Sequence, residues 1–540
     1  MISGIRHIIA SKYGLMGLVL LANIVFMTVM AVALPIGYEE NDDVMMCMIA
    51  NGSYSGTPDY HLVYINVLYG MVLVWLYGLT KAIEWYTLSF VVLHVVSMTV
   101  LVYCILTMCN RAWWERILWL LALYVLWARI IVALQFTTTA GLVCLAGCVL
   151  LMRESAKSRW TGVALIVIAA LIRFMAAGLV GVLMAPIIVY TLRLEWRRYI
   201  PIVVMLVLVV GCRVANGYVY NSSPEWRYYR EYNQLRAQLN DNPNAYHLYV
   251  NQLPEGVDKE DYKLLMNFTP DPEQIDLVRI RQLQAMVENM PYARQWRNLH
   301  RLDKYAVEIG ILIALLVLMV LTTGNRTKYI FLILYSAFVV ALVVHVSLDG
   351  FLKNRVFLCM LLPMLMTDFY LLPNTTGMKR KYALCVAMAM LSGWYVWQTN
   401  QDIISSKSIR YAWNRLQLPL MEHVPDNGCL INIGATAMTQ GMNPFRISMP
   451  VNRYGAGWLT AIPFNKTKLQ SFRELCHPDK YIMVNRNYRE EESRMQTVRR
   501  QMEHDYGLRT CVVPICHNGA YAIVQLQPVG DSKRVENTIK

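Results

Sequence analysis

Four carboxylates lie within five positions just after the first long apolar segment: Glu39, Glu40, Asp42 and Asp43. The simplest explanation of such a run is a solvated loop that ends a helix. Here a turn rich in Gly, Tyr and Pro (51–60) and another apolar segment follow, and these can cover the loop at a membrane surface. A carboxylate that is partly removed from water can act as a general base. We therefore predict Asp42 or Asp43 as the catalytic base, with Glu40 in the same site.

Basic residues next to apolar segments form a second group. Arg129 lies within the third apolar run, Arg173 separates two such runs, and Lys353 and Arg355 share the short loop 349–355. An arginine in lipid is costly and is by default a functional residue, unless it reaches the headgroups by snorkelling. Snorkelling is the alternative for Arg129 and Arg173. We predict that the four residues bind an anionic group.

Guanidinium groups and carboxylates on one membrane face suit a particular chemistry. Arginine binds phosphate oxygens bidentately and stabilises the charge that develops as a phosphate leaves. A nearby carboxylate can remove the proton from an attacking hydroxyl. For the sugar or acceptor we predict four polar or aromatic residues near the same face: Gln135, Thr137, Tyr60 and His61. Hydrogen bonding within a helix turn is an equally good explanation for 135–139.

The elements that position these residues are membrane spans. The chain has 540 residues, of which 56% are hydrophobic and 16% charged, and this excludes a water-soluble enzyme. A helix of about 20 apolar residues crosses roughly 30 Å of hydrocarbon. We predict eleven spans, at 15–36, 84–108, 117–135, 136–152, 160–172, 174–192, 199–215, 306–323, 329–348, 356–373 and 382–398.

Charge decides how the apolar segment Tyr60–Thr80 lies. If it is an interfacial helix, the larger basic clusters share the cytoplasmic side with Arg6 and Lys12, as the positive-inside rule requires; these clusters lie at 111–116, 153–159, 193–198, 326–328 and 379–381. If it crosses, the following loops invert and the rule fails. We therefore predict a multi-pass plasma-membrane protein with a cytoplasmic N-terminus. A cleaved signal ending at 31–33 is the alternative for the first segment, which is longer than a usual signal core.

The predicted fold class is mainly α, polytopic, with a C-terminal extracytoplasmic α/β domain. Residues 1–398 form the transmembrane domain, including a first outer loop (37–83) and an outer loop domain (213–305) that is helical at 276–298. Residues 399–540 form the C-terminal domain. Its strand-length runs are rich in Val, Ile and Tyr, at 429–433, 481–484, 511–515 and 520–526, and 489–504 is helical.

Several ligand classes lose support. The net charge of +14 is explained by membrane topology, so no nucleic acid is expected as a partner. The twelve cysteines show no zinc-site spacing; disulfides among Cys429, Cys476, Cys511 and Cys516, and reduced thiols, are both allowed. His94 and His345 lie in apolar spans, where a neutral histidine hydrogen-bonded between helices is expected.

The acidic loop after the first span, the interfacial helix, about a dozen spans and the C-terminal α/β domain resemble the C-type (GT-C) superfamily of integral membrane glycosyltransferases. More closely, Glu39–Asp43, the turn 52–58 and Leu134–Ala140 resemble a group of uncharacterised bacterial membrane proteins within it. The resemblance covers roughly residues 1–400 in architecture and the first outer loop in motif. It implies a polyprenyl-phosphate sugar donor, inversion at the anomeric carbon and a catalytic carboxylate at Asp42 or Asp43.

Some members of the superfamily also bind a divalent metal, Mg²⁺ or Mn²⁺, at such carboxylates, and no other outer carboxylate motif in this sequence decides the point. The expected partners are a polyprenyl-phosphate-linked sugar, a glycan, lipid or protein acceptor, and membrane lipids. Two rival functions are a flippase for lipid-linked oligosaccharides, or other transporter, and a non-catalytic assembly scaffold. A transporter would place its charges near the midplane and often show two similar halves.

Overall fold

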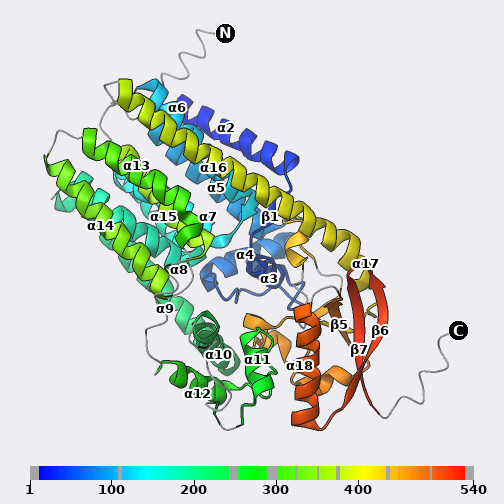
Figure 1. Ribbon diagram of the computed structural model, residues 1–540. Helices are drawn as coiled ribbons and strands as arrows, with labels where there is room; N and C mark the ends of the chain where they lie inside the picture. The colour runs from blue at the N-terminus through cyan, green and yellow to red at the C-terminus, as the bar shows by residue number, and fades with distance from the viewer. Residues whose placement is uncertain are drawn as a thin grey trace.

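The computed structural model describes residues 11–107, 112–193, 195–242, 245, 253–254, 256–288, 299, 302–322, 326–349, 352–371, 378–432, 438–448, 451–486 and 489–529. Figure 1 shows a bundle of long helices at the top and a smaller layer of helices and a sheet at the bottom. The short elements α3 and α4 lie between the two parts.

The bundle consists of α2 (Lys12–Ala33), α5 (Trp85–Thr107), α6 (Trp113–Val132), α7 (Phe136–Leu151), α8 (Ala156–Leu192), α9 (Trp196–Asn221), α13 (Ala306–Thr322), α14 (Arg326–Asp349), α15 (Asn354–Leu371) and α16 (Met378–Tyr411). Each predicted span coincides with one of these helices, and two spans fall in α8. Within the described ranges, six helices are both long and apolar enough to cross a membrane. The prediction of a mainly α, polytopic membrane protein is confirmed.

The chain reverses direction within α8, at Arg173. The backbone there is extended (φ −152°, ψ 97°) between two helical halves. A straight helix of 37 residues would be about 55 Å long. Yet Thr191, near its end, donates a hydrogen bond to the sulfur of Met152, which precedes its start (3.8 Å). The halves therefore form a hairpin, as the two predicted spans on either side of Arg173 require.

The hairpin packs closely on α7 because two glycines face each other. A Cβ atom on Gly162 would lie 2.6 Å from the carbonyl oxygen of Gly147, and one on Gly147 would lie 2.8 Å from that of Gly162. Small residues let helix backbones approach in this way in membranes. The contact fixes the hairpin, and hence Arg173 at its turn, relative to the N-terminus of α7.

Basic residues that were predicted on the cytoplasmic side gather at one end of the bundle. Arg153 donates to the hydroxyl of Thr107 (2.7 Å), and Arg116 to the carbonyl of Leu106 (2.6 Å). These contacts join the end of α5 to the starts of α6 and α8. We call this the basic end, and the opposite end, which carries residues 37–66, the carboxylate end.

The segment Tyr60–Thr80 contains the helix α4 (Val67–Leu79). Its 13 residues span about 20 Å, which is too short to cross the hydrocarbon core. Val72, Trp75 and Leu79 are exposed, whereas the opposite face packs on the protein. Asn66 caps the helix through Leu68 N–H and also donates to the carbonyl of Cys212 in α9 (3.0 Å). These features fit a helix lying along the membrane surface.

A cysteine at the exposed position 81 tests this arrangement. In a background without reactive native cysteines, Lys81→Cys should react with an impermeant thiol reagent added outside intact cells. Labelling only after permeabilisation would instead mean that the segment crosses the membrane. The loops that follow it would then be inverted.

The layer at the carboxylate end has two parts. The outer loop segment contains α10 (Pro224–Asp241), α11 (Lys259–Met266) and α12 (Leu277–Glu288); residues 289–298 of its predicted helix lie outside the described ranges. Its own core includes Tyr232, Leu239, Leu265 and Ile280.

The C-terminal part contains a five-stranded mixed sheet of order β4-β3-β5-β7-β6. The strands are β3 (Cys429–Ile431), β4 (Asn452–Tyr454), β5 (Lys480–Asn485), β6 (Thr510–Asn518) and β7 (Tyr521–Pro528), and β4 was not predicted. The helix α18 (Arg489–Tyr506) packs on one face through Met495, Val498 and Met502. The α/β prediction for this region is confirmed, and α16 continues beyond residue 398 to Tyr411.

Among the described residues all cysteines are free, including Cys429, Cys476, Cys511 and Cys516. His94 is hydrogen-bonded between helices, as expected. The Trp127 indole donates to its Nδ1 (3.2 Å), so Nε2 carries the proton and donates to Thr139 Oγ1 (2.9 Å).

Candidate active site

A short parallel strand pair fixes the first outer loop at the carboxylate end. β1 (Gly37–Tyr38) pairs with β2 (Ala133–Leu134), in the turn between α6 and α7. The Glu39 N–H continues the pairing by donating to the Leu134 carbonyl (3.0 Å). The acidic run is thereby held against the start of α7.

Asp42 and Asp43 lie in the first turn of α3 (Asn41–Asn51), where the helix dipole favours negative charge. Asp43 is completely buried. Its Oδ1 accepts hydrogen bonds from the Tyr86 hydroxyl (2.9 Å) and the Phe136 N–H (3.1 Å). Its Oδ2 is buried without a hydrogen-bond partner within the described part of the chain. Asp43 thus anchors α3 to α5 and α7.

Asp42 is more accessible to solvent than Asp43. It is half-buried, and its Oδ1 accepts a hydrogen bond from the indole N–H of Trp458 in the C-terminal domain (2.9 Å). Positive charge reaches it from Arg355, Lys353 and Arg173. Asp42 is therefore the member of the pair that combines accessibility with nearby cations.

Arg355 and Arg173 present their guanidinium groups differently. Arg355, in the first turn of α15, forms an ion pair with Glu40 (2.9 Å). The Arg173 guanidinium lies over two aromatic rings, 5.4 Å from the centre of Tyr64 and 5.3 Å from that of Phe136. Within the described residues it makes no ion pair or protein hydrogen bond. The rings of Tyr64 and Phe136 hold the Arg173 guanidinium by cation–π attraction and leave its N–H groups available to an anion.

Arg129 has protein partners of its own. Its Nε lies 3.2 Å from Asp402 Oδ2 in α16, and its guanidinium carbon lies 5.3 Å from the centre of the Tyr395 ring. Its positive charge reaches Glu39, on the far side of the acidic run from Asp42. Lys353 is exposed and immediately precedes α15.

Gln135 and Thr137 are part of the start of α7. The Gln135 side chain accepts hydrogen bonds from the N–H groups of Thr137 (2.6 Å) and Thr138 (3.2 Å), and it therefore caps the helix. Both residues are buried. These contacts are the hydrogen bonding within a helix turn that the sequence also allowed.

Tyr60 and His61 lie in an aromatic cluster. The His61 ring stacks on Trp226 of α10 with ring centres 4.0 Å apart, and Tyr60 lies 4.3 Å from His61. The His61 Nδ1 is 2.8 Å from Asp59 Oδ1. The pair connects the first outer loop to α10, and Tyr60 remains half-buried.

Burial governs the electrostatics of the acidic run. It raises the pKa of Glu39 to about 7, with a further contribution from Glu40. It also raises the pKa of Asp42, although Arg355, the Trp458 N–H and Lys353 act in the opposite direction. The pKa of Asp43 lies well above its usual range, again because of burial. Both aspartates therefore bind protons more readily than an exposed aspartate does.

The carboxylates of the acidic run, all among the described residues, interact with protein groups and do not gather as a set of three metal ligands. No three of its carboxylates converge on one point in the described structure. Glu40 is paired with Arg355, and Asp43 uses one oxygen to bind protein donors. Arg355, Lys353 and Arg173 supply positive charge near Asp42 in this cluster.

Sequence reasoning missed several contributors to the site. Trp458 lies 416 positions from its partner Asp42, in a segment with no catalytic motif. Tyr64 bridges Arg173 and Trp458, since its ring centre is 5.2 Å from that of Trp458. Arg213 stands over Phe174, one residue beyond the α8 turn, at 5.6 Å. The position of Arg213 near the end of an apolar run was the only feature of the sequence that could have indicated its place beside the site.

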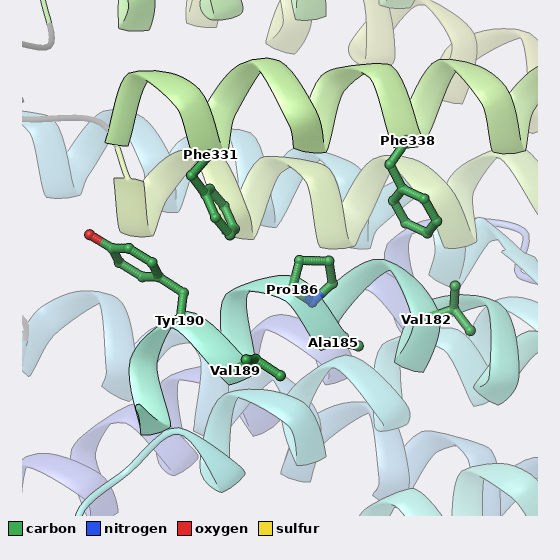
Figure 2. Close-up of a pocket in the computed structure, with 7 residues that line it drawn as sticks. All are labelled: Val182, Ala185, Pro186, Val189, Tyr190, Phe331 and Phe338. Atoms are coloured by element: carbon green, nitrogen blue, oxygen red, sulfur yellow. The ribbon is translucent and has the colours of Figure 1, made fainter. Parts of the chain in front are cut away.

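A separate groove of about 650 Å³ lies between the second half of α8 and α14. Figure 2 shows its lining side chains, which are Val182, Ala185, Pro186, Val189, Tyr190, Phe331 and Phe338. Val182 is nine positions beyond Arg173, so the groove begins about 13 Å further along the helix. It contains no charged group and belongs to the basic half of the bundle rather than to the acidic site.

Comparison with solved structures shows similarity to two crystal structures of ArnT from Cupriavidus metallidurans. The apo form is 14% identical, with a TM-score of 0.42, and the match covers 94% of this chain and 97% of that chain. The form bound to undecaprenyl phosphate is 13% identical, with a TM-score of 0.41, and covers 95% and 98%. No protein-family model and no curated protein matches the sequence. Both structural matches extend over nearly the whole of each chain.

Proposed function

We propose that the protein is a membrane glycosyltransferase that moves a sugar from a polyprenyl-phosphate carrier to a hydroxyl group on an extracytoplasmic glycan, lipid or protein. One observation carries the proposal. Asp42, an accessible carboxylate held by Trp458, faces three cations of which Arg173 has no anionic partner within the described residues. This arrangement supplies a base and an anion site side by side at one end of a bundle of apolar helices.

The reaction follows from these positions. The acceptor oxygen attacks the anomeric carbon of the sugar, and the bond from that carbon to the phosphate oxygen breaks. Asp42 takes the hydroxyl proton, and the polyprenyl phosphate leaves with an additional negative charge. Arg173, Arg355 and Lys353 stabilise that charge. Attack from the side opposite the leaving phosphate inverts the anomeric configuration.

Asp43 has a positioning role in this proposal. Its completely buried side chain holds the first turn of α3 through Tyr86 and Phe136, and so fixes the neighbouring Asp42. Glu40 shares Arg355 with the phosphate site and limits where that guanidinium can move. Trp458 extends the site into the C-terminal domain, which together with the outer loop segment would bind the acceptor.

A transfer assay tests the proposal. Purified protein in nanodiscs is given radiolabelled polyprenyl-phosphate sugars and a panel of membrane glycans, lipids and peptides. We expect release of polyprenyl phosphate coupled to an inverted glycosidic bond with at least one pair. Translocation of uncleaved lipid-linked sugar across proteoliposomes, without transfer, would instead support a transporter.

The pH dependence of transfer should report the charge around Asp42. A base must be ionised, so activity falls as pH drops through its pKa. Arg355 is the strongest of the charges that lower this pKa. Arg355→Gln removes that effect, so the pKa of Asp42 rises and the acidic limb of the kcat/KM profile moves to higher pH. Arg129→Gln is the matched control, because its charge acts on Glu39, and it should leave the limb in place. An unmoved limb in Arg355→Gln would exclude Asp42 as the titrating group.

A further inference from the structure

A histidine and two aspartates meet where the outer loop segment contacts the C-terminal domain. The His504 Nδ1 lies 2.8 Å from Asp505 Oδ1 and 3.0 Å from Asp258 Oδ2. The three atoms that could bind a metal ion lie within 4.8 Å of one another. The His504 side chain is 67% exposed, so the group can be reached from solvent.

The second observation is a buried carboxylate that lacks part of its hydrogen bonding. The Asp505 side chain is only 9% exposed, and its Oδ2 has no hydrogen-bond partner among the described residues. Its other oxygen faces His504. A buried carboxylate oxygen without a partner costs free energy, and an ion bound through both oxygens of Asp505 would satisfy it.

Negative charge is in excess at this point. Asp258 uses its Oδ1 to accept the Asp261 N–H (2.7 Å), and the Asp261 side chain accepts the Asp258 N–H in return. Three carboxylates, those of Asp258, Asp261 and Asp505, therefore gather around one imidazole. Within the described ranges, neither Asp258 nor Asp505 has an ion pair with a lysine or arginine.

We infer that His504, Asp505 and Asp258 form a divalent cation site with a preference for Zn²⁺. One imidazole and two carboxylates are the ligand set that Zn²⁺ accepts, whereas Mg²⁺ and Ca²⁺ favour oxygen ligands alone. A tetrahedral ion with bonds of about 2.1 Å separates its ligands by roughly 3.4 Å, so small side-chain movements suffice. Water completes the coordination, and the metal replaces the proton shared by His504 and the carboxylates.

The ion would join two parts of the outer layer. Asp258 is the N-cap of α11, and His504 and Asp505 are in the last turn of α18. The same interface contains a hydrogen bond between Gln501 and Asp261 and one from Tyr506 to Asp271 (2.8 Å). The site is distinct from the acidic run on α3, and its predicted role is to fasten the outer loop segment to the C-terminal domain.

Calorimetric titration with ZnCl₂ tests the inference. The full-length chain is purified without a polyhistidine tag, treated with a chelator and titrated in nanodiscs. We expect one saturable site per chain. His504→Ala and Asp505→Asn should each weaken Zn²⁺ binding by at least about tenfold. His423→Ala, at an exposed histidine of the same domain, should bind like the parent.

Two further measurements on the parent chain keep the test independent of variant folding. Anomalous scattering at the zinc edge should place the ion in contact with His504, Asp505 and Asp258, and Zn²⁺ should slow hydrogen exchange in α11 and at the end of α18. Three results would overturn the site. The parent chain could show no saturable Zn²⁺ binding, His504→Ala and Asp505→Asn could bind Zn²⁺ as tightly as the parent, or the anomalous peak could lie elsewhere. The cluster would then be a simple ion pair.

Discussion

Replacing Asp42 by asparagine should lower the turnover for sugar transfer by roughly 10²- to 10⁴-fold, the range expected for loss of a positioned general base. Asparagine keeps the shape of the side chain and can still accept the Trp458 N–H, but it cannot take a proton from the acceptor. Binding of polyprenyl phosphate should change little, because the proposed phosphate site consists of the cations and not of Asp42. Turnover and phosphate binding are measured on the same nanodisc preparation.

Asp43→Asn is the matched comparison for this experiment. The amide oxygen can replace the carboxylate oxygen that accepts from Tyr86 and the Phe136 N–H. The variant should therefore retain most of its transfer activity. Any loss of activity should be matched by a loss of folding stability. Loss confined to Asp43→Asn would transfer the role of base to Asp43. Full activity in both variants would remove the base from the first outer loop.

Arg173→Leu should weaken the binding of polyprenyl phosphate by roughly 100-fold, since two charge-assisted hydrogen bonds at about 1.5 kcal/mol each are lost. The variant should still insert and fold, because Arg173 lies at the turn between the two halves of α8 and replacing its charge by an apolar side chain adds no cost of membrane insertion. Arg173→Lys keeps the charge but not the planar guanidinium between Tyr64 and Phe136. Its affinity for polyprenyl phosphate should therefore lie between those of the parent chain and Arg173→Leu.

Arg197→Leu is the control for that series. Arg197 also lies over an aromatic ring, that of Trp196 at 5.6 Å, but it is at the start of α9 in the basic end. Its removal should leave phosphate affinity unchanged. If Arg173→Leu binds polyprenyl phosphate as tightly as the parent chain, Arg173 only snorkels and the phosphate is held elsewhere.

The membrane helices were predictable because they depend on local sequence. Apolar length marked each span, and the break at Arg173 marked the turn within α8, since a charged residue between two apolar runs is favoured at an interface. Four strands of the C-terminal sheet, including the three-residue β3, were visible in their Val, Ile and Tyr content. β4, with three residues that include a buried arginine, has no such pattern.

Pairings between distant residues were not predictable from one sequence. The acidic run was recognised as a candidate site, but Trp458, which donates a hydrogen bond to Asp42, comes from the C-terminal domain. Arg129 was grouped with the phosphate site because of its charge and depth, and only the fold reveals its partner Asp402, 273 positions away. Gln135 could equally have bound a sugar or capped α7, and the cap depends on backbone geometry that composition does not encode.

A density map of the protein in nanodiscs with undecaprenyl phosphate added is the most direct test of the proposed site. The proposal predicts the phosphate within about 4 Å of guanidinium nitrogens of Arg173 and Arg355, with the Asp42 carboxylate facing it across a space large enough for a sugar. Phosphate density at the basic end, near Arg153 and Arg116, with none at the first outer loop, would contradict it.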